Sequence, residues 1–261
     1  MSKKRSEFDK RMKKYEYVSR TYLTTRTPVI IRIDGKCFHS FTRGFKKPFD
    51  EILSGTMQET MKYLCENIQG CVLGYTQSDE ITLILIDYQK LTSSAWFDYE
   101  VQKICSISAS MATLAFNKSF KLEVDYLFTQ INDYAPYDEK TYVQTLFKAL
   151  RRGAMFDTRC FNIPKEEVCN LIYWRQLDAI RNSIQMVGQA NFSHKELQNK
   201  SCNDIQDMLM TQKGINWNNF AVDEKRGSCC VKNGNGWIID REIPIFKNED
   251  REYIEKLMRV E

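Results

Sequence analysis

The sequence predicts an α/β (α+β) fold: an antiparallel β-sheet with helices on one face, followed by a helical C-terminal part with a small hairpin. Two observations predict it. Short β-branched and apolar runs alternate with stretches in which apolar residues recur at helical spacing, and one polar tetrapeptide joins two apolar runs as in a hairpin. The chain has 261 residues, enough to bury a core in one or two domains.

The first strand and the first core helix follow from residue type and spacing. Residues 28–34 are rich in valine and isoleucine and open with Pro28, which a strand tolerates at its first position. Between Asp50 and Gly70 an apolar residue recurs every three or four positions, which predicts a helix with one buried face. These apolar residues are Leu53, Met57, Met61, Leu64 and Ile68.

A hairpin, a second helix and a last strand complete the N-terminal half. Two apolar runs, 71–75 and 81–86, flank the polar residues 77–80, which is the pattern of a hairpin. Helical spacing predicts a helix over 101–115, and a further strand is predicted at 158–163. The order strand, helix, hairpin, helix, strand is that of the ferredoxin-like fold, and also of polymerase-palm and cyclase domains.

The C-terminal part is predicted to be mainly helical. A long amphipathic helix is expected over 165–190. Two capping-box patterns, at 193–196 and 201–204, each predict a helix start. Two short strands, at 228–232 and 237–240, flank a turn-rich Asn-Gly-Asn-Gly segment and predict the small hairpin.

These elements divide the chain into two predicted domains. Residues 1–164 form a palm-like domain with a basic N-terminal segment, and residues 165–261 form a helical region packed on the palm. The net charge is only +4, but basic residues crowd the N-terminus, where they either form a solvated face or neutralise nucleic-acid phosphates. They are Lys3, Lys4, Arg5, Lys10, Arg11, Lys13 and Lys14.

Composition argues against several classes of protein. No stretch approaches the roughly 18 to 20 apolar residues that a membrane-spanning helix requires. The N-terminus lacks the apolar core of a secretory signal, and its acidic residues are unlike a mitochondrial transit peptide. We therefore expect a cytoplasmic protein with no membrane partner. Nine cysteines without a C-x-x-C pair and only two histidines disfavour a zinc site of the usual spacing.

Two aspartates are placed for metal chemistry. Asp34 ends the first strand, and Asp79 lies in the turn of the central hairpin. In this topology the strand end and the turn are neighbours, so we expect both carboxylates at one site. Hard oxygen ligands suit Mg²⁺, and two such ions activate an attacking oxygen and neutralise a leaving pyrophosphate. Gly35 follows Asp34, and its carbonyl can approach a metal closely because it has no side chain.

Five sequence blocks, in order, resemble the signatures of the tRNA-His guanylyltransferase (Thg1) family. Residues 32–42, R-I-D-G-K-C-F-H-S-F-T, resemble its R-[IL]-D-G-R-x-F-H-x-F block. Residues 75–80, Y-T-Q-S-D-E, resemble its Y-x-Q-S-D-E block. Residues 46–50, 14–18 and 174–178 are similar to its K-P-x-D, K-[FY]-E-Y-V and W-R-Q-x-D elements. Five ordered matches make a chance coincidence negligible.

The resemblance implies a palm-like catalytic domain that extends RNA in the 3′-to-5′ direction. A 5′-monophosphorylated tRNA would be activated with ATP or GTP. The 3′-hydroxyl of an incoming nucleoside triphosphate would then displace the activating group, or attack a 5′-triphosphate directly. By matching positions, Asp34, the Gly35 carbonyl and Asp79 would hold two Mg²⁺ ions, with Asp34 and Asp79 as the catalytic residues.

The same matching implies the residues around the nucleotide. Lys47 would offer a cation to phosphate, and Asp50 would help to place the activating base. Apart from this matching, Glu80 begins a strand and has the structural task of orienting Asp79 or Lys36. The nucleotide and triphosphate site would be lined by Lys36, Cys37, Phe38, His39 and Ser78. Apart from the resemblance, each of these residues also has an ordinary structural role, in the core, in a cap or turn, or at the surface.

One departure from the family pattern narrows the function. Eukaryotic guanylyltransferases carry H-I-N-N after W-R-Q-x-D, whereas this chain has A-I-R-N at 179–182. That tetrapeptide is associated with adding an extra, non-templated G, so its loss resembles the Thg1-like protein (TLP) branch, which repairs 5′-truncated tRNAs by templated addition. The resemblance therefore predicts template-dependent tRNA 5′-end repair by a homotetramer, a dimer of dimers, with tRNA and nucleoside triphosphates as partners.

Three alternatives stay open. The first alternative is a maturation enzyme that adds G at position −1 of tRNA-His. A nucleotide cyclase would use the same two aspartates but release a cyclic nucleotide. A non-catalytic RNA-binding palm module would keep the fold, although intact Asp34, Gly35, Ser78 and Asp79 disfavour it, because charging a buried carboxylate without a metal is costly.

Overall fold

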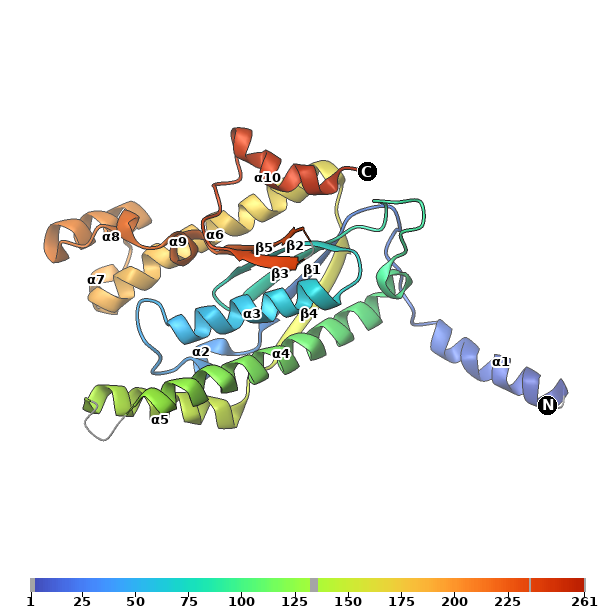
Figure 1. Ribbon diagram of the computed structural model, residues 1–261, viewed down its shortest axis with the longest axis horizontal. Coiled ribbons are helices and arrows are strands. Elements are labelled where there is room, and N and C mark those ends of the chain that lie inside the picture. Colours follow the sequence, from blue (N-terminus) through green and yellow to red (C-terminus); the bar gives the residue numbers. More distant parts are fainter. Residues whose placement is uncertain (1–2, 132–135, 235, 261) are drawn as a thin grey trace.

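The centre of the molecule is a six-stranded antiparallel sheet, seen edge-on between layers of helices in Figure 1. The computed structural model describes residues 3–131, 136–234 and 236–260, without the side chains of residues 3–5. The strand order is β4-β1-β3-β2-β5-β6. The strands are β1 (Val29–Gly35), β2 (Cys71–Gln77), β3 (Glu80–Leu85), β4 (Phe156–Asn162), β5 (Ser228–Asn233) and β6 (Gly236–Asp240).

The described part contains short and long helices, of which α3, α4, α6, α7 and α8 were predicted. The helices are α1 (Lys3–Tyr17), α2 (Phe38–Phe41), α3 (Glu51–Asn67), α4 (Val101–Gln130), α5 (Tyr137–Arg152), α6 (Val168–Asn191), α7 (His194–Leu197), α8 (Cys202–Met208), α9 (Val222–Arg226) and α10 (Glu252–Glu255). The predicted order strand, helix, hairpin, helix, strand is confirmed, as is the long helix α6. Helices α1, α2, α5, α9 and α10 were not predicted.

Helix α4 is twice as long as the sequence pattern predicted, because its buried stripe continues beyond residue 115. Phe116, Phe120 and Val124 lie one turn apart and are fully buried. Neither glycine nor proline interrupts the helix between residues 116 and 130. The extra turns carry the aromatic side chains that pack under the loop after β1.

Helices cover both faces of the sheet. In Figure 1, α3 and α4 lie on one face and α6 and α10 lie on the other. Side chains alternate accordingly along β1: Ile31 and Ile33 belong to the core beneath α3 and α4, whereas Ile30 belongs to the core beneath α6 and α10. The palm's own helices therefore cover one face, as expected, and the C-terminal region covers the opposite face.

The predicted C-terminal hairpin is confirmed, and it continues the central sheet. Strand β5 pairs with β2 in antiparallel register, with Gly74 opposite Cys230 and Thr76 opposite Ser228. Asn235, in the turn of this hairpin, lies outside the described residues. The division of the chain at residue 164 stays a prediction, but the two parts share one sheet.

Both capping boxes are confirmed. The Ser193 backbone N–H donates to the Glu196 carboxylate at 2.8 Å, and the Glu196 N–H donates to the Ser193 hydroxyl at 3.4 Å. Ser201 and Asp204 repeat the arrangement at 2.8 and 3.2 Å. Each box satisfies two backbone donors at a helix start, so α7 and α8 begin where the sequence placed them.

Helix α1 projects from the body of the molecule (Figure 1) and carries the basic N-terminal cluster. The side chains from Lys10 to Lys14 are exposed, whereas those of Lys3, Lys4 and Arg5 lie outside the described residues. No helix in the described ranges combines the length and the apolar character that crossing a membrane requires.

Candidate active site

Two carboxylates meet where β1 ends and the β2–β3 turn begins. The Gly35 backbone N–H donates a 3.0 Å hydrogen bond to the Asp79 carbonyl oxygen, which fixes the strand end against the turn. Burial and the neighbouring Asp34 charge raise the pKa of Asp79. Burial, followed by the charges of Glu80 and Asp157, raises the pKa of Asp34. The structure therefore brings the two predicted metal ligands together.

A third carboxylate at this edge, Asp157, was not predicted. It lies directly opposite Asp34 in the register between β1 and β4, and it forms a 3.4 Å ion pair with Arg159. The sequence prediction began this strand at residue 158, so the cross-strand position of Asp157 was missed. An acid two residues before an arginine, on a strand that pairs with β1, is the signal that identifies it.

Two backbone positions beside the carboxylates are unusual. Ser78 and Cys37 are not glycines, yet both have left-handed backbone angles, with φ of 51° and 56°. The Ser78 hydroxyl donates a 3.1 Å hydrogen bond to the Asp79 carboxylate. This bond orients Asp79 and opposes part of the rise in its pKa.

A cavity of about 550 Å³ opens beside this edge, and most of the residues predicted to bind the nucleotide line it. They are Gly35, Cys37, Phe38, His39, Lys47, Asp50, Ser78 and Asp79. Asp34 and Lys36 are not part of the lining, and the Lys36 backbone N–H donates to the Met155 carbonyl. Met186 and Gln189 of α6 also line the cavity, so the C-terminal region contributes to it in a way that the sequence did not reveal.

Phe38 is mainly a packing residue in the structure. Its ring is almost fully buried and lies 5.1 to 5.5 Å from the rings of Phe41, Phe116 and Phe156. A Cβ added to Gly35 would come within 2.3 Å of the Phe38 ring. The glycine after Asp34 is therefore required for packing, whatever its carbonyl binds, and the predicted contact of Phe38 with nucleotide stays a prediction.

Asp50 has a structural task that the sequence analysis did not assign. It caps α3, since its carboxylate accepts the Leu53 N–H at 3.0 Å. The same carboxylate accepts the Lys46 N–H at 2.9 Å and the Tyr142 hydroxyl at 2.7 Å. Asp50 therefore anchors the loop that carries Lys47 at the cavity, and its expected role in placing a base stays a prediction.

Glu80 joins the catalytic hairpin to α6. The Arg175 guanidinium donates two hydrogen bonds to its carboxylate, at 2.7 and 2.8 Å, and Arg32 donates a third at 2.6 Å. Arg175 also donates to Asp178 at 2.9 Å, and the Trp174 ring lies against both arginines. The expected orientation of Asp79 or Lys36 by Glu80 stays a prediction, and the hydrogen bonds of the Glu80 carboxylate go to these arginines.

This network explains why two distant sequence blocks occur together. The Y-T-Q-S-D-E block supplies the acid, and the W-R-Q-x-D block supplies the arginine and its second carboxylate. Gln176 of the second block bonds the Pro244 carbonyl at 2.8 Å and the Phe246 N–H at 3.1 Å, which ties down the chain before α10. The two blocks thus fix α6 across the sheet behind Asp79.

Comparisons with known proteins agree with this site. Residues 9–164 match the family model described as Thg1, tRNAHis guanylyltransferase. The chain is similar to a bacterial tRNA(His) guanylyltransferase (Thg1)-like protein in complex with ATP, with a TM-score of 0.83 and 44% identity over 97% of this chain and 100% of that one. A second such structure, in complex with GTP, gives a TM-score of 0.76 and 39% identity over the same shares of the two chains.

A curated relative extends the similarity to eukaryotes. The tRNA(His) guanylyltransferase of Eremothecium gossypii is 26% identical over 254 residues, which cover 92% of this chain and 95% of the relative. The resemblance to the guanylyltransferase family, inferred from the five sequence blocks, and to its Thg1-like branch, inferred from the A-I-R-N stretch, is confirmed by these matches.

Replacing Arg175 with alanine is expected to destabilise the fold by about 3 to 5 kcal/mol, because it leaves the buried Glu80 carboxylate with an incomplete set of partners. Urea unfolding measures this. Arg181→Ala is the matched control on the same helix. Its guanidinium is exposed and, among the described residues, pairs only with Asp178 and Asn182, so we expect a change within about 0.5 kcal/mol. Equal effects of the two variants would contradict the anchoring role of Glu80.

The raised pKa of Asp79 gives a pH-dependent prediction. A carboxyl whose folded pKa lies above its unfolded pKa favours folding below the unfolded value, and this stability is lost as the pH rises through the folded value. Asp79→Asn should therefore be more stable than the wild type at pH 7 in EDTA, and the difference should shrink towards pH 3. Urea midpoints at the two pH values test this, and a less stable variant at pH 7 would contradict it.

Proposed function

Because the chain belongs to the tRNA-His guanylyltransferase family and is a nucleotidyltransferase of that family, we propose that it repairs the 5′ end of tRNA by template-dependent 3′-to-5′ nucleotide addition. The observation that carries the proposal is the joint position of Asp34 and Asp79 beside a cavity. The similar bacterial proteins are in complex with ATP and GTP, which supports nucleotide binding by this chain.

The donor set fits Mg²⁺. The charge of Asp34 raises the pKa of Asp79, and the charges of Glu80 and Asp157 raise the pKa of Asp34, which is the electrostatic situation that a cation relieves. Within the described residues no group of three or more histidine, cysteine, aspartate or glutamate residues is arranged as a metal site. Mg²⁺ does not need one, because it binds through one or two carboxylates and the substrate phosphates. Asp34, the Gly35 carbonyl and Asp79 would hold two ions, which neutralise phosphate charge and activate the attacking hydroxyl.

The remaining residues of the site would bind and orient the reactants. Lys47 is exposed at the cavity and supplies a cation for triphosphate, while the Asp50 cap holds its loop in place. Cys37, His39 and Ser78 lie at the same cavity, within reach of the nucleotide. In the transfer step the 3′-hydroxyl oxygen of the incoming nucleotide bonds to the 5′ phosphorus of the RNA, and the activating nucleotide leaves as its monophosphate.

Templated repair is favoured over tRNA-His maturation by the residues on α6. The stretch that corresponds to H-I-N-N lacks the histidine and the first asparagine. Ala179 is buried at the histidine position, and Arg181 pairs with Asp178 of the W-R-Q-x-D block. The side chains associated with non-templated addition of G are therefore absent from this surface.

A second candidate is the addition of G at position −1 of tRNA-His. It is favoured by the relative from Eremothecium gossypii, which is named for that activity and aligns with nearly the whole chain. It would use the same two carboxylates and the same cavity. The two candidates differ in whether the base opposite the added nucleotide decides which nucleotide enters.

We also propose that the active form is a homotetramer, a dimer of dimers. Leu114, Leu122 and Tyr126 form an exposed apolar stripe along the outer side of α4, at the spacing of one helical face. A second copy would cover this stripe. Sedimentation at micromolar concentration tests this: Leu122→Glu with Tyr126→Glu should lower the particle mass, and a monomeric wild type would contradict the proposal.

The decisive experiment is a 5′-extension assay with Mg²⁺, ATP, all four nucleoside triphosphates and a 5′-monophosphorylated tRNA that lacks its first nucleotide. We expect growth by one nucleotide whose identity follows the opposite base. Asp79→Ala should lower the rate at least about 100-fold, because it removes a metal ligand worth several kcal/mol to the transition state. Asp207→Asn, at an exposed position of α8, is the matched control and should retain full activity.

Other results would change the proposal. A single G added to full-length tRNA-His regardless of the opposite base would favour the maturation reaction. No extension of either RNA, with RNA binding retained, would favour the non-catalytic RNA-binding module.

A further inference from the structure

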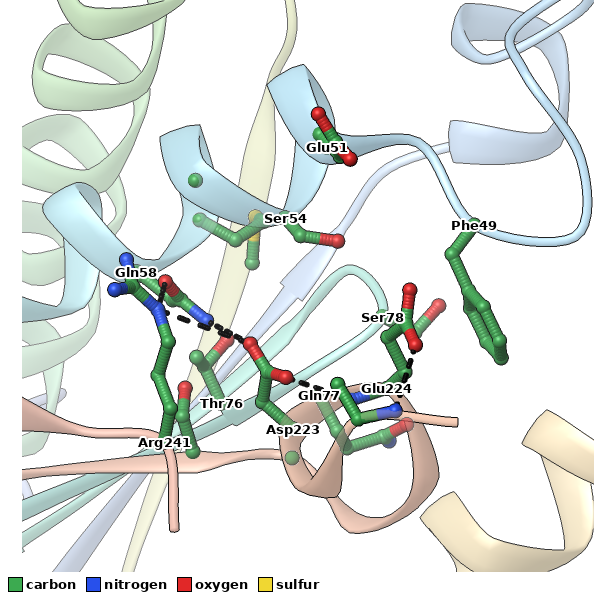
Figure 2. Close-up of a pocket in the computed structure, with 15 residues that line it drawn as sticks. Phe49, Glu51, Ser54, Gln58, Thr76, Gln77, Ser78, Asp223, Glu224 and Arg241 are labelled. Carbon is green, nitrogen blue, oxygen red and sulfur yellow. Dashed lines mark hydrogen bonds and ion pairs between the residues drawn. The ribbon is translucent and has the colours of Figure 1, made fainter. Parts of the chain in front are cut away.

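A second cavity, of about 320 Å³, lies beside the turn between β2 and β3 (Figure 2). Helix α3 forms one wall with Glu51, Ser54 and Gln58, and the turn residues Gln77 and Ser78 form another. Asp223 and Glu224 of α9 face them across the opening, and Phe49 stands at the rim in Figure 2. Ser78 lines both this cavity and the nucleotide cavity. The sequence analysis did not predict this second cavity.

Gly55 is one of the residues that line this cavity. It lies inside α3, where glycine costs roughly 1 kcal/mol relative to alanine, and a Cβ built on it meets nothing within 4 Å. Gly35, Gly74 and Gly188 lack that freedom, because a Cβ there would overlap neighbouring side chains. Packing therefore does not explain Gly55, whereas a ligand that approaches the helix backbone does.

One polar side chain at the cavity has no partner within the described part of the chain. The Glu51 carboxylate borders the opening and forms no hydrogen bond or ion pair there. Ser228 also lines the cavity; it is 1% exposed and pairs with Thr76 in the sheet. A ligand group that donates to the Glu51 carboxylate would form a charge-assisted hydrogen bond.

The chemistry of the lining favours a nucleoside over a polyphosphate. Glu51, Asp223 and Glu224 are anionic, and Arg241 already bonds Gln58 at 2.8 Å and lies 3.8 Å from Asp223. Phosphate would be repelled, whereas the amino groups of a base and the hydroxyls of a ribose would donate to these carboxylates. The volume is near the lower limit of the roughly 300 to 1,000 Å³ of small-molecule sites, which suits one nucleoside.

We propose that this cavity binds the nucleoside of a second reactant, with its base against the Phe49 ring and its donor groups on Glu51 and Glu224. The inference rests on the proposed function, because nucleotide addition brings two nucleotides to one pair of carboxylates. The two cavities that Ser78 lines provide one place for each. The nucleoside belongs either to a free nucleoside triphosphate or to the terminal nucleotide of the RNA, and binding measurements distinguish these two sources.

The test is Gly55→Leu, which places a side chain into the cavity from a position whose Cβ meets no atom within 4 Å. The matched control is Glu66→Leu, an exposed position on α3, eleven residues further along the helix and roughly 16 Å away. Thermal unfolding first establishes that both variants fold. Dissociation constants in Mg²⁺ are then measured for ATP, for GTP and for the 5′-truncated tRNA.

We expect Gly55→Leu to raise one of these dissociation constants at least tenfold and Glu66→Leu to leave all three within twofold of the wild type. An effect on ATP or GTP assigns the cavity to a free nucleotide, and an effect on tRNA assigns it to the RNA. Unchanged binding of all three ligands to Gly55→Leu would overturn the inference. Failure of the proposed function is a separate result, because it requires that the wild type extends no RNA.

Discussion

The site depends on one buried ion pair. Glu80 is the first residue of β3, directly after Asp79, and Arg175 holds its carboxylate with two hydrogen bonds from α6. A bidentate guanidinium fixes direction as well as distance, which lysine would not do. Because Arg32 of β1 binds the same carboxylate, the end of β1, the hairpin turn and the C-terminal helix are set relative to one another at a single point. The nucleotide cavity, which has walls from all three, takes its shape from this contact.

The same edge contains an arrangement that folding alone disfavours. Asp34 faces the exposed Asp157 across the strands and approaches Asp79 at the turn, and the burial of Asp34 and Asp79 strengthens the repulsion between their two charges. Stable cores pair their buried charges, as Glu80 does with Arg175. Asp34 and Asp79 form no ion pair among the described residues, and such carboxylates beside a cavity are typical of sites that bind a cation and charged substrates.

The sequence was sufficient for the strand order of the palm and for the meeting of Asp34 and Asp79, because both follow from local patterns and topology. The sequence was not sufficient to predict the role of a side chain whose hydrogen-bond partner is distant in the chain. Asp50 looked like a ligand contact but is held by Tyr142, ninety-two residues away. Glu80 looked like a neighbour of Asp79 but is bound by Arg175. Gly55 gave no signal in the sequence, and only the open space around it in the structure distinguishes it.

The pairing of β5 with β2 has a consequence for how the protein can be divided. A chain that ended near residue 164 would leave β2 as a bare sheet edge, with unpaired N–H and carbonyl groups along Leu73 to Thr76. It would also leave the face around Ile30 and Ile84 open to water, since α6 and α10 cover it. Residues 1–164 therefore do not form an independent folding unit. Gene fusions, split reporters or minimised enzymes that contain the palm should also contain the C-terminal residues 165–261.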